Sequence, residues 1–340
     1  MPDTSLSILD VGHGNSAVLI DVGKTVVIDA GPGTALLEFL TEEEIRKVDV
    51  LLISHADRDH IEGVISLIES ENVAIDLVRL NTDSMKGSKL WDDLIYELDQ
   101  ANKAGNLQFE IGLSSNDTGK FSTESVHIEI VAPSPYLAAK GPGSSDRGGR
   151  HLTSNTVSAV IRLVRRGKPV ALIPGDIDHI GLEYLSSSGF EAAAPIAVFP
   201  HHGGKPGKGD MTEFAHKFCE IVEPENVIFS TGRARYNTPR SEIIAAVCKK
   251  CPKVRFLCTQ LSEHCASLLP EEQPSHLSGK FSRGLEYNRC CAGTIFIPLD
   301  NSTLTLFPLP EDHLEFIRKA APTALCMRPF QSQNRCREKE

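Results

Sequence analysis

The chain lacks long apolar segments. None of its hydrophobic runs approaches the ~18 consecutive apolar residues that a membrane-spanning helix needs. The first residues, Met1 to Ser5, do not start a basic stretch followed by an apolar run, which is the pattern of a secretory signal peptide. From these two absences we expect a cytoplasmic protein with no membrane partner.

Cysteine is absent from the chain before Cys219. The chain has nine cysteines, an odd number, and all lie at or beyond Cys219. This distribution argues against the disulfide framework of an extracellular protein and favours reduced thiols in the cytosol.

Basic residues are also scarce relative to acidic ones. The chain has 35 Lys and Arg against 45 Asp and Glu, a formal net charge of −10. This balance disfavours a broad nucleic-acid-binding surface, although a local basic groove is compatible with it. The length of 340 residues and the hydrophobic content of 41% are those of a globular protein with one large domain or two smaller ones.

The chain does contain a dense cluster of metal-ligating side chains. His55, Asp57, Asp59 and His60 lie within six residues, between an apolar strand-like run at 49–53 and apolar residues at helical spacing. Imidazole accepts Zn, Mn, Fe or Ni, whereas carboxylate suits harder ions such as Mn and Mg. Each residue alone could cap a strand or a helix, but four together indicate a metal site.

This cluster resembles the His-x-His-x-Asp-His signature of the metallo-β-lactamase fold, with Asp57 in place of the second histidine. The variant is similar to that of the hydrolase domain of the ComEC competence proteins. The turn at 10–16 resembles the Asp-Val-Gly-Gln-Gly-Asp-Ser opening of that domain, with His13 and Asn15 replacing the glutamine and the acid. The resemblance implies an α/β (α+β) fold, the four-layer αββα metallo-β-lactamase sandwich. Full-length ComEC proteins are membrane channels, so the chain would match only their hydrolase part.

Three further motifs occur along the chain in the order that this family shows. They are Ile28-Asp29-Ala30-Gly31, Pro174-Gly175-Asp176 and Pro200-His201-His202-Gly203. We expect Asp29 to support the metal loop by hydrogen bonds. His13 is either a similar supporting residue or a surface histidine of the turn.

The resemblance also implies which residues bind two divalent metal ions, Zn or Mn. His55 and Asp57 would hold the first ion, and Asp59 and His60 would begin the second site. Asp176 would bridge the ions, His202 would complete the second site, and His201 would orient the substrate. The expected metal ligands are therefore His55, Asp57, Asp59, His60, Asp176 and His202, and the expected catalytic residues are Asp59 and His201.

One later motif departs from the family. ComEC-type domains carry a site-facing histidine at the position of Thr238 in this chain. Arg233, Arg235 and Arg240 surround that position, and arginine forks pair with phosphate oxygens. The alternative is a solvated basic turn.

Between the motifs, the pattern predicts further elements. These are three strands between residues 5 and 29, a helix from Ala35, a strand at 74–80, a helix at 91–102, a strand at 126–132, an irregular stretch at 133–154 and a closing hairpin between 292 and 307.

We expect three regions in the chain. Residues 1–257 would form the hydrolase core, 258–310 a cysteine-rich extension that closes the sandwich, and 311–340 a helix with a polar tail. Cys258, Cys265, Cys290 and Cys291 could bind a separate structural zinc ion, and buried free cysteines are the alternative.

The resemblance implies a phosphodiesterase or nuclease that uses a metal-bridged hydroxide, with Asp59 guiding the proton of the water. The substrate would be DNA or a small nucleotide. The carboxylate of Asp57 favours Mn without excluding Zn. Two alternatives stay open: a lactonase or other ester hydrolase, and a regulatory binding protein with a degenerate site, which Asn15 and Thr238 favour. A protein partner is compatible with the sequence but cannot be recognised in it.

Overall fold

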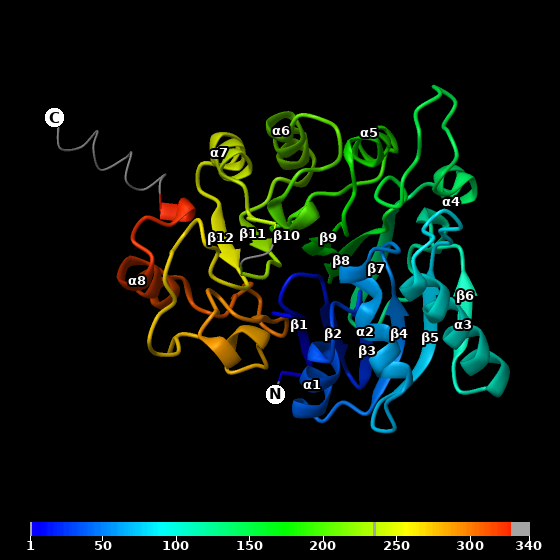
Figure 1. Cartoon of the computed structure of the whole chain (residues 1–340), viewed down its shortest axis with the longest axis horizontal. Coiled ribbons are helices and arrows are strands. Elements are labelled where there is room, and N and C mark those ends of the chain that lie inside the picture. Colours follow the sequence, from blue (N-terminus) through cyan, green and yellow to red (C-terminus); the bar gives the residue numbers. More distant parts are fainter. Residues whose placement is uncertain (1, 234–235, 328–340) are drawn as a thin grey trace.

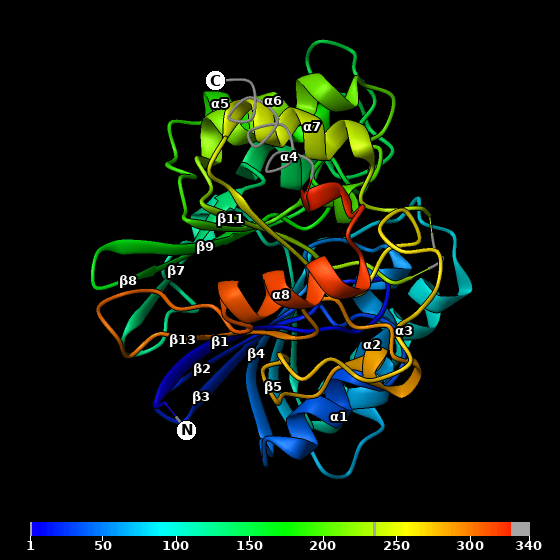
Figure 2. The same cartoon turned by 90° about the vertical axis from the view of Figure 1, so that its left-hand side faces the viewer.

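Two β-sheets face each other in the structure, a computed structural model that describes residues 2–233 and 236–327 (Figures 1 and 2). The first sheet has the strand order β13-β1-β2-β3-β4-β5-β6, and the second has the order β12-β11-β10-β9-β8-β7. The first sheet consists of β1 Thr4–Ile8, β2 Ala17–Asp21, β3 Lys24–Ile28, β4 Lys47–Leu52, β5 Ala74–Leu80, β6 Gln108–Ile111 and β13 Ile295–Pro298. The second consists of β7 Val126–Ala132, β8 Val160–Arg165, β9 Lys168–Ile173, β10 Ile196–Val198, β11 Asn226–Phe229 and β12 Arg255–Cys258.

Helices cover the outer faces of both sheets (Figure 2). The helices on the first sheet are α1 Ala35–Glu42, α2 Arg58–Ile68 and α3 Lys89–Ala104. Those on the second sheet are α5 His179–Ser187, α6 Met211–Val222 and α7 Ser241–Lys250. The remaining helices are α4 Pro135–Lys140, α8 Pro310–Ala320 and the short 3-10 helices η1 Ser115–Asp117, η2 Pro200–Gly203, η3 Arg283–Tyr287 and η4 Leu325–Met327. Among the helices of the described residues, none combines the length and the apolar character needed to cross a bilayer.

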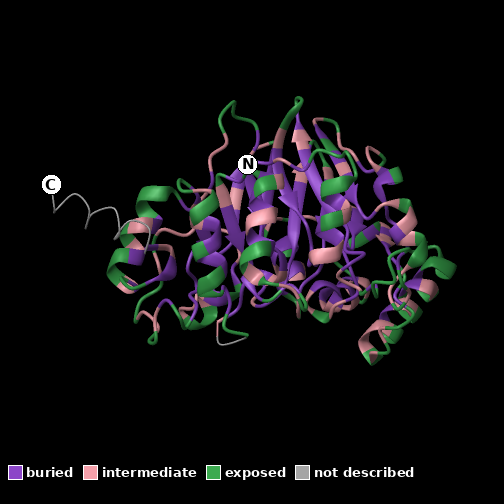
Figure 3. Ribbon diagram, turned by 90° about the horizontal axis from the view of Figure 1, so that it is seen from above, coloured by how far each residue is buried: buried purple, intermediate pink, exposed green. Residues whose placement is uncertain are grey.

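Apolar side chains fill three layers of core. One core lies between the sheets, where Ile8 and Leu19 of the first sheet belong to the same buried cluster as Ile128 and Ile161 of the second. The other two cores lie between each sheet and its helices. Figure 3 shows the buried strands beneath helices whose outer faces are exposed. Because both faces of each sheet are covered, the central strands are apolar along their length. The expected four-layer αββα sandwich is thus confirmed.

The central strands of each sheet run parallel, from β3 to β6 in the first sheet and from β9 to β12 in the second. Ligands of such sheets bind beyond the carboxyl ends of the strands. Asp29 follows β3 and His55 follows β4, while Asp176 and His201 follow β9 and β10. The motifs of both sheets therefore lie at strand ends suited to a shared site.

Strand β13 joins the last part of the fold to its beginning. It pairs antiparallel with β1, with Leu6 opposite Ile297. The predicted closing hairpin is wrong in its second half, because only a single bridge between Phe296 and Phe307 forms there. The predicted boundary at residue 257 lies inside β12, and the division into three regions stays a prediction.

The stretch at 133–154 is more regular than expected. Helix α4 begins directly after Ser134, whose hydroxyl accepts a hydrogen bond of 3.3 Å from the backbone N–H of Leu137. Pro135 occupies the first turn, where its missing N–H has no helical partner to lose. A serine cap followed by proline is a typical start of a helix. Because glycine-rich residues follow it, the sequence predicted an irregular stretch here instead.

Candidate metal centre

Four turns place histidines and aspartates around one point between the sheets. The β1–β2 turn carries His13, the β4–α2 turn carries His55, and the first turn of α2 carries Asp59 and His60. From the second sheet, Asp176 lies in the β9–α5 turn, and η2, after β10, carries His201 and His202.

The ligand atoms of these residues form two groups. His55, His60 and Asp176 make the first group, and His13, Asp59 and His202 make the second. Within each group the imidazole nitrogens and carboxylate oxygens lie within 4.8 Å of one another. The Nε2 atom of His202 is also 3.9 Å from Oδ2 of Asp176, so the two groups adjoin.

The spacing within the groups fits a metal ion. His60 Nε2 is 3.6 Å from Asp176 Oδ1, and His13 Nε2 is 3.7 Å from Asp59 Oδ2. Two ligand atoms that bind the same ion, each at ~2.0–2.2 Å, lie roughly 3–4 Å from each other. The Nε2 atoms of His55 and His60 are buried and, within the described residues, have no hydrogen-bond partner. A divalent ion would satisfy both nitrogens.

Asp29 orients the first group from behind. Its Oδ2 accepts a hydrogen bond of 2.7 Å from His60 Nδ1 and one of 2.8 Å from the hydroxyl of Ser54. The backbone N–H of Ser54 donates to Oδ1 at 2.7 Å. These bonds confirm the expected supporting role of Asp29, because they fix the His60 ring with Nε2 toward the group.

The two adjacent histidines of η2 take different positions. Both have left-handed backbones, with φ of 53° at His201 and 55° at His202. His202 Nδ1 donates to the carbonyl of Ser230 at 2.6 Å, and its Nε2 lies 3.2 Å from Asp59. His201 lies beside Asp176 instead, with Nδ1 3.5 Å from Oδ2. The structure therefore puts His202 in a ligand group and His201 next to it.

Asp57 lies outside both groups. Its carboxylate forms an ion pair with Lys86, which follows β5, and its Oδ2 is 3.7 Å from His55 Nε2. Asp57 as a metal ligand stays a prediction. The contact with Lys86 has no signal in the sequence, because Lys86 belongs to no motif and is far along the chain.

Mutual charge shifts the protonation of the centre. Burial alone would raise the pKa of Asp176, but His201, His202 and His60 outweigh it and hold that pKa well below its usual range. Burial would likewise lower the pKa of His202, but Asp176 and Asp59 raise it. For His201 burial prevails over Asp176, and the pKa is lowered.

Thr238 and two of the arginines near it, Arg233 and Arg240, can be placed in the structure. Thr238 is buried, and its hydroxyl lies 2.6 Å from that of Thr231. The Arg233 guanidinium donates to the carbonyls of Leu261, Ala266 and Ser267. Arg240 lies directly before α7 and is exposed, and Arg235 lies outside the described residues.

The suggested zinc site at four cysteines stays a prediction. No group of metal-ligating atoms in the described part of the chain includes Cys258, Cys265, Cys290 or Cys291. Cys290 Sγ points to Asp10, 3.6 Å from Oδ2, whereas Cys291 Sγ lies 3.4 Å from His313 Nε2. Burial, reinforced by neighbouring thiols, raises the pKa of Cys291 well above its usual value.

Known proteins resemble this chain in sequence and in fold. Residues 9–207 match the model of the metallo-beta-lactamase superfamily, and this range contains every residue of the two ligand groups. ComE operon protein 3 of Bacillus subtilis is 21% identical over 322 residues, which cover 88% of this chain and 35% of that protein. Competence protein ComA of Neisseria gonorrhoeae is 23% identical over 266 residues, which cover 76% of this chain and 31% of that protein.

The chain thus spans about a third of the length of these curated relatives. The metallo-beta-lactamase fold protein YhfI of Bacillus subtilis superposes with a TM-score of 0.48 at 9% identity, over 75% of this chain and 96% of that one. The family match covers more than half of the chain, includes both ligand groups and agrees with the four-layer fold. The chain therefore belongs to the metallo-beta-lactamase superfamily and is a metal-dependent hydrolase of that class.

Proposed function

We propose that the chain hydrolyses phosphodiesters at a centre of two divalent metal ions. The observation that carries this proposal is the pair of adjoining ligand groups, which meet through Asp176 and His202. His55, His60 and Asp176 would hold one ion, and His13, Asp59 and His202 the other. When bound, a pair of such ions lowers the pKa of water and stabilises charge on a phosphoryl group.

The protein groups around the centre have separate tasks. Asp59 stays ionised, because its imidazole neighbours lower its pKa although burial opposes them. Its carboxylate can hold the attacking water and accept a hydrogen bond from it. His201 stays neutral near pH 7, since burial lowers its pKa. Its Nε2, which has no hydrogen-bond partner in the described chain, is available to orient the substrate.

The ligand chemistry supports a phosphodiester over other esters. The aspartates at 59 and 176 supply hard oxygen ligands, which suit Mn as well as Zn. Lys86 and a nearby arginine-lined pocket supply positive charge beside the centre. The complete ligand groups argue against a regulatory protein with a degenerate site.

The test is hydrolysis of bis(p-nitrophenyl) phosphate and of single- and double-stranded DNA by protein reloaded with Mn or Zn. We expect metal-dependent turnover that Asp59→Ala reduces at least 100-fold. Asp99→Ala, at an exposed position of α3, is the matched control and should keep full activity. A panel of lactones runs in parallel.

Full activity of Asp59→Ala would refute the proposed role of Asp59. Faster turnover of lactones than of any phosphodiester would replace the proposed substrate class. The metal content of each protein, measured by mass spectrometry, should be two ions per chain for the wild type.

A further inference from the structure

The segment around η3 is fastened to the turn that carries His13. Asp10, which is fully buried, precedes this turn. Its Oδ2 accepts a hydrogen bond of 2.9 Å from the backbone N–H of Gly284, and its backbone carbonyl accepts one of 2.9 Å from Arg283 N–H. Gln260 donates to Oδ1 at 2.9 Å. These bonds hold side chains from beyond residue 257 in a fixed place beside His13.

A pocket of about 340 Å³ lies between the two segments. We name it the arginine pocket. One wall is the turn with Gly12 and His13. His13 also contacts Asp59 and His202, so the pocket adjoins the second ligand group. The pocket is also lined by Arg233, Arg283, Tyr287 and Arg289.

The arginine pocket has an excess of positive charge. Its acidic residue, Glu62, is paired with Arg58. Within the described residues, neither Arg233 nor Arg289 has an ion pair with a carboxylate. Arg233 donates to backbone carbonyls, and Arg289 stacks on the ring of Tyr287, 4.6 Å from its centroid.

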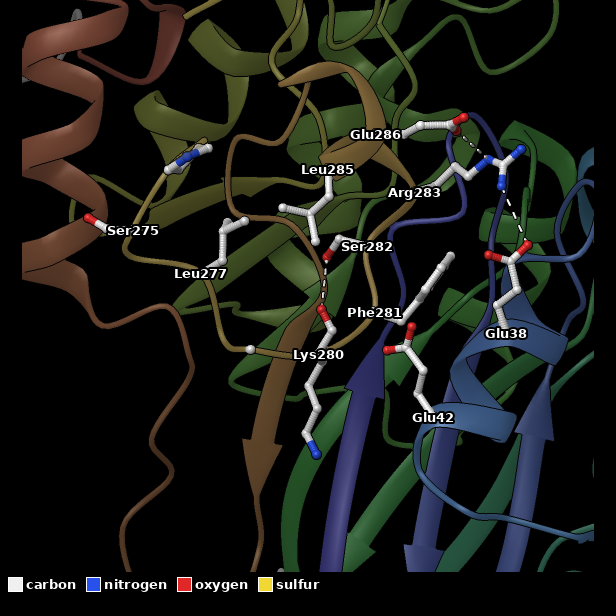
Figure 4. Close-up of a pocket in the computed structure, with 12 residues that line it drawn as sticks. Glu38, Glu42, Ser275, Leu277, Lys280, Phe281, Ser282, Arg283, Leu285 and Glu286 are labelled. Atoms are coloured by element: carbon white, nitrogen blue, oxygen red, sulfur yellow. Dashed lines mark hydrogen bonds and ion pairs between the residues drawn. The ribbon is translucent and has the colours of Figure 1, made fainter. Parts of the chain in front are cut away.

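Arg283 separates this pocket from a neighbouring one of different character. Figure 4 shows Arg283 directed toward Glu38 and Glu286. Its Nη1 atom is 3.5 Å from Oε1 of Glu38, and its Nε atom is 4.0 Å from Oε2 of Glu286. The neighbouring pocket, of about 610 Å³, is lined by these two glutamates and by Glu42. Its carboxylates disfavour an anion, so an anionic ligand is expected only on the His13 side of Arg283.

We infer that the arginine pocket binds the nucleotide unit next to the scissile phosphodiester. Arg289 binds the phosphate of this unit, because a guanidinium fork matches phosphate oxygens. Arg233, whose terminal nitrogens donate to backbone carbonyls, contributes its positive charge. Tyr287, which is 54% exposed, offers a face on which a base stacks. The volume is near the lower end of the ~300–1,000 Å³ of small-ligand sites, which suits one nucleotide. This inference rests on the proposed phosphodiesterase function and narrows its substrate to nucleotides with a second phosphate.

The first experiment measures binding of deoxyadenosine monophosphate, deoxyadenosine and inorganic phosphate to the metal-loaded full chain by calorimetry. We expect the nucleotide to bind at least tenfold more tightly than either fragment. Arg289→Gln should lose this advantage while its affinity for inorganic phosphate, which the ions bind, stays the same. Arg318→Gln, on the exposed face of α8, is the control with the same change of charge and should keep the advantage.

Tyr287 provides a second variant that leaves the arginines in place. Tyr287→Ala should weaken binding of the nucleotide about as much as binding of the nucleoside, and Tyr287→Phe should restore both, because stacking needs only the ring. Equal nucleotide affinity in the Arg289→Gln and Arg318→Gln proteins would overturn the inference.

The second experiment compares hydrolysis of a dinucleotide with and without a 5′-phosphate. Wild type should show a KM at least tenfold lower for the phosphorylated form with a similar kcat, and Arg289→Gln should abolish this difference. A wild-type protein that does not distinguish the two substrates contradicts the inference. If no phosphodiester is hydrolysed, the proposed function fails, and the calorimetric result for Arg289 decides the pocket independently.

Discussion

At the scale of single residues, the centre is organised by competition between protons and metal ions for the same nitrogens. Burial alone would lower the pKa of His60, but the carboxylates of Asp29 and Asp176 raise it well above its usual value. His202 is shifted in the same direction. An ion that binds Nε2 of either ring must displace a proton that the negative charge of the nearby carboxylates stabilises.

We therefore predict that metal affinity rises with pH beyond the range in which an ordinary histidine titrates. Below the raised pKa values both imidazoles are protonated and binding is weak. Affinity should grow by ~10-fold per pH unit for each displaced proton and level off above those pKa values. Titration with Mn by calorimetry, in buffers of different ionisation enthalpy, measures both the affinity and the protons released. An affinity that is already constant above pH 6.5 would contradict this prediction.

The pair formed by Lys86 and Asp57 gives a second prediction at this scale. Lys86 forms an ion pair with Asp57, and its positive charge beside the centre repels a bound cation. Lys86→Gln should therefore tighten binding of Mn roughly fivefold, the equivalent of about 1 kcal/mol. Lys89→Gln, at an exposed position three residues further on, should leave the affinity unchanged. Weaker binding by Lys86→Gln would show that Lys86 supports the site.

The resemblance of the motifs to those of the metallo-β-lactamase fold was enough to predict that residues near 55–60, Asp176 and His202 lie together. It could not decide between the two interpretations of His13, because that depends on a 3.7 Å approach to Asp59 across two turns. It also could not reveal Lys86, whose contact depends on how the loop after β5 folds back.

At the scale of elements, β13 shows what the sequence could and could not indicate. Its apolar residues predicted a strand, and the strand is present. Its partner could not be inferred, because β1 lies at the other end of the described chain and no local signal links the two. The strands β1 to β5 and β7 were easier to recognise, since their alternating or continuous apolar runs are bounded by turn residues. Strand β6, Gln108–Ile111, is short and was not predicted.

We predict that β13 stabilises the first sheet as much as a central strand does. Ile297 is completely buried between the sheets, so Ile297→Ala should lower the free energy of unfolding by ~2–5 kcal/mol. Leu268→Ala, at a residue that is 81% exposed, is the control and should change it by less than ~0.5 kcal/mol. Urea unfolding followed by circular dichroism measures both values. If both variants lower the free energy of unfolding by the same small amount, β13 is not part of the cooperative core.

At the scale of the whole molecule, each ligand group takes residues from both sheets. His55 and His60 come from the first sheet and Asp176 from the second, while His13 and Asp59 face His202. A bound ion would therefore join the two sheets as well as serve catalysis.

We predict that divalent metal raises the thermal stability of the protein through this link. At a free ion concentration 100 times the Kd, one site adds ~2.7 kcal/mol, which corresponds to a rise in Tm of several degrees. His202→Ala should lose a large part of this rise. His127→Ala, on the exposed side of β7, should keep it. Calorimetric scans with and without Mn measure the rise in Tm of the three proteins, and an equal rise in all of them would show that the ions bind elsewhere.

The pairing of β1 with β13 also bears on how the chain is made. During synthesis β1 emerges with one neighbour, β2, while the strand that completes its other side is translated after all the other strands of the described residues. An unpaired edge of this kind can pair with another nascent chain. The N-terminal half is therefore expected to depend on chaperones until the ribosome has released residues 295–298.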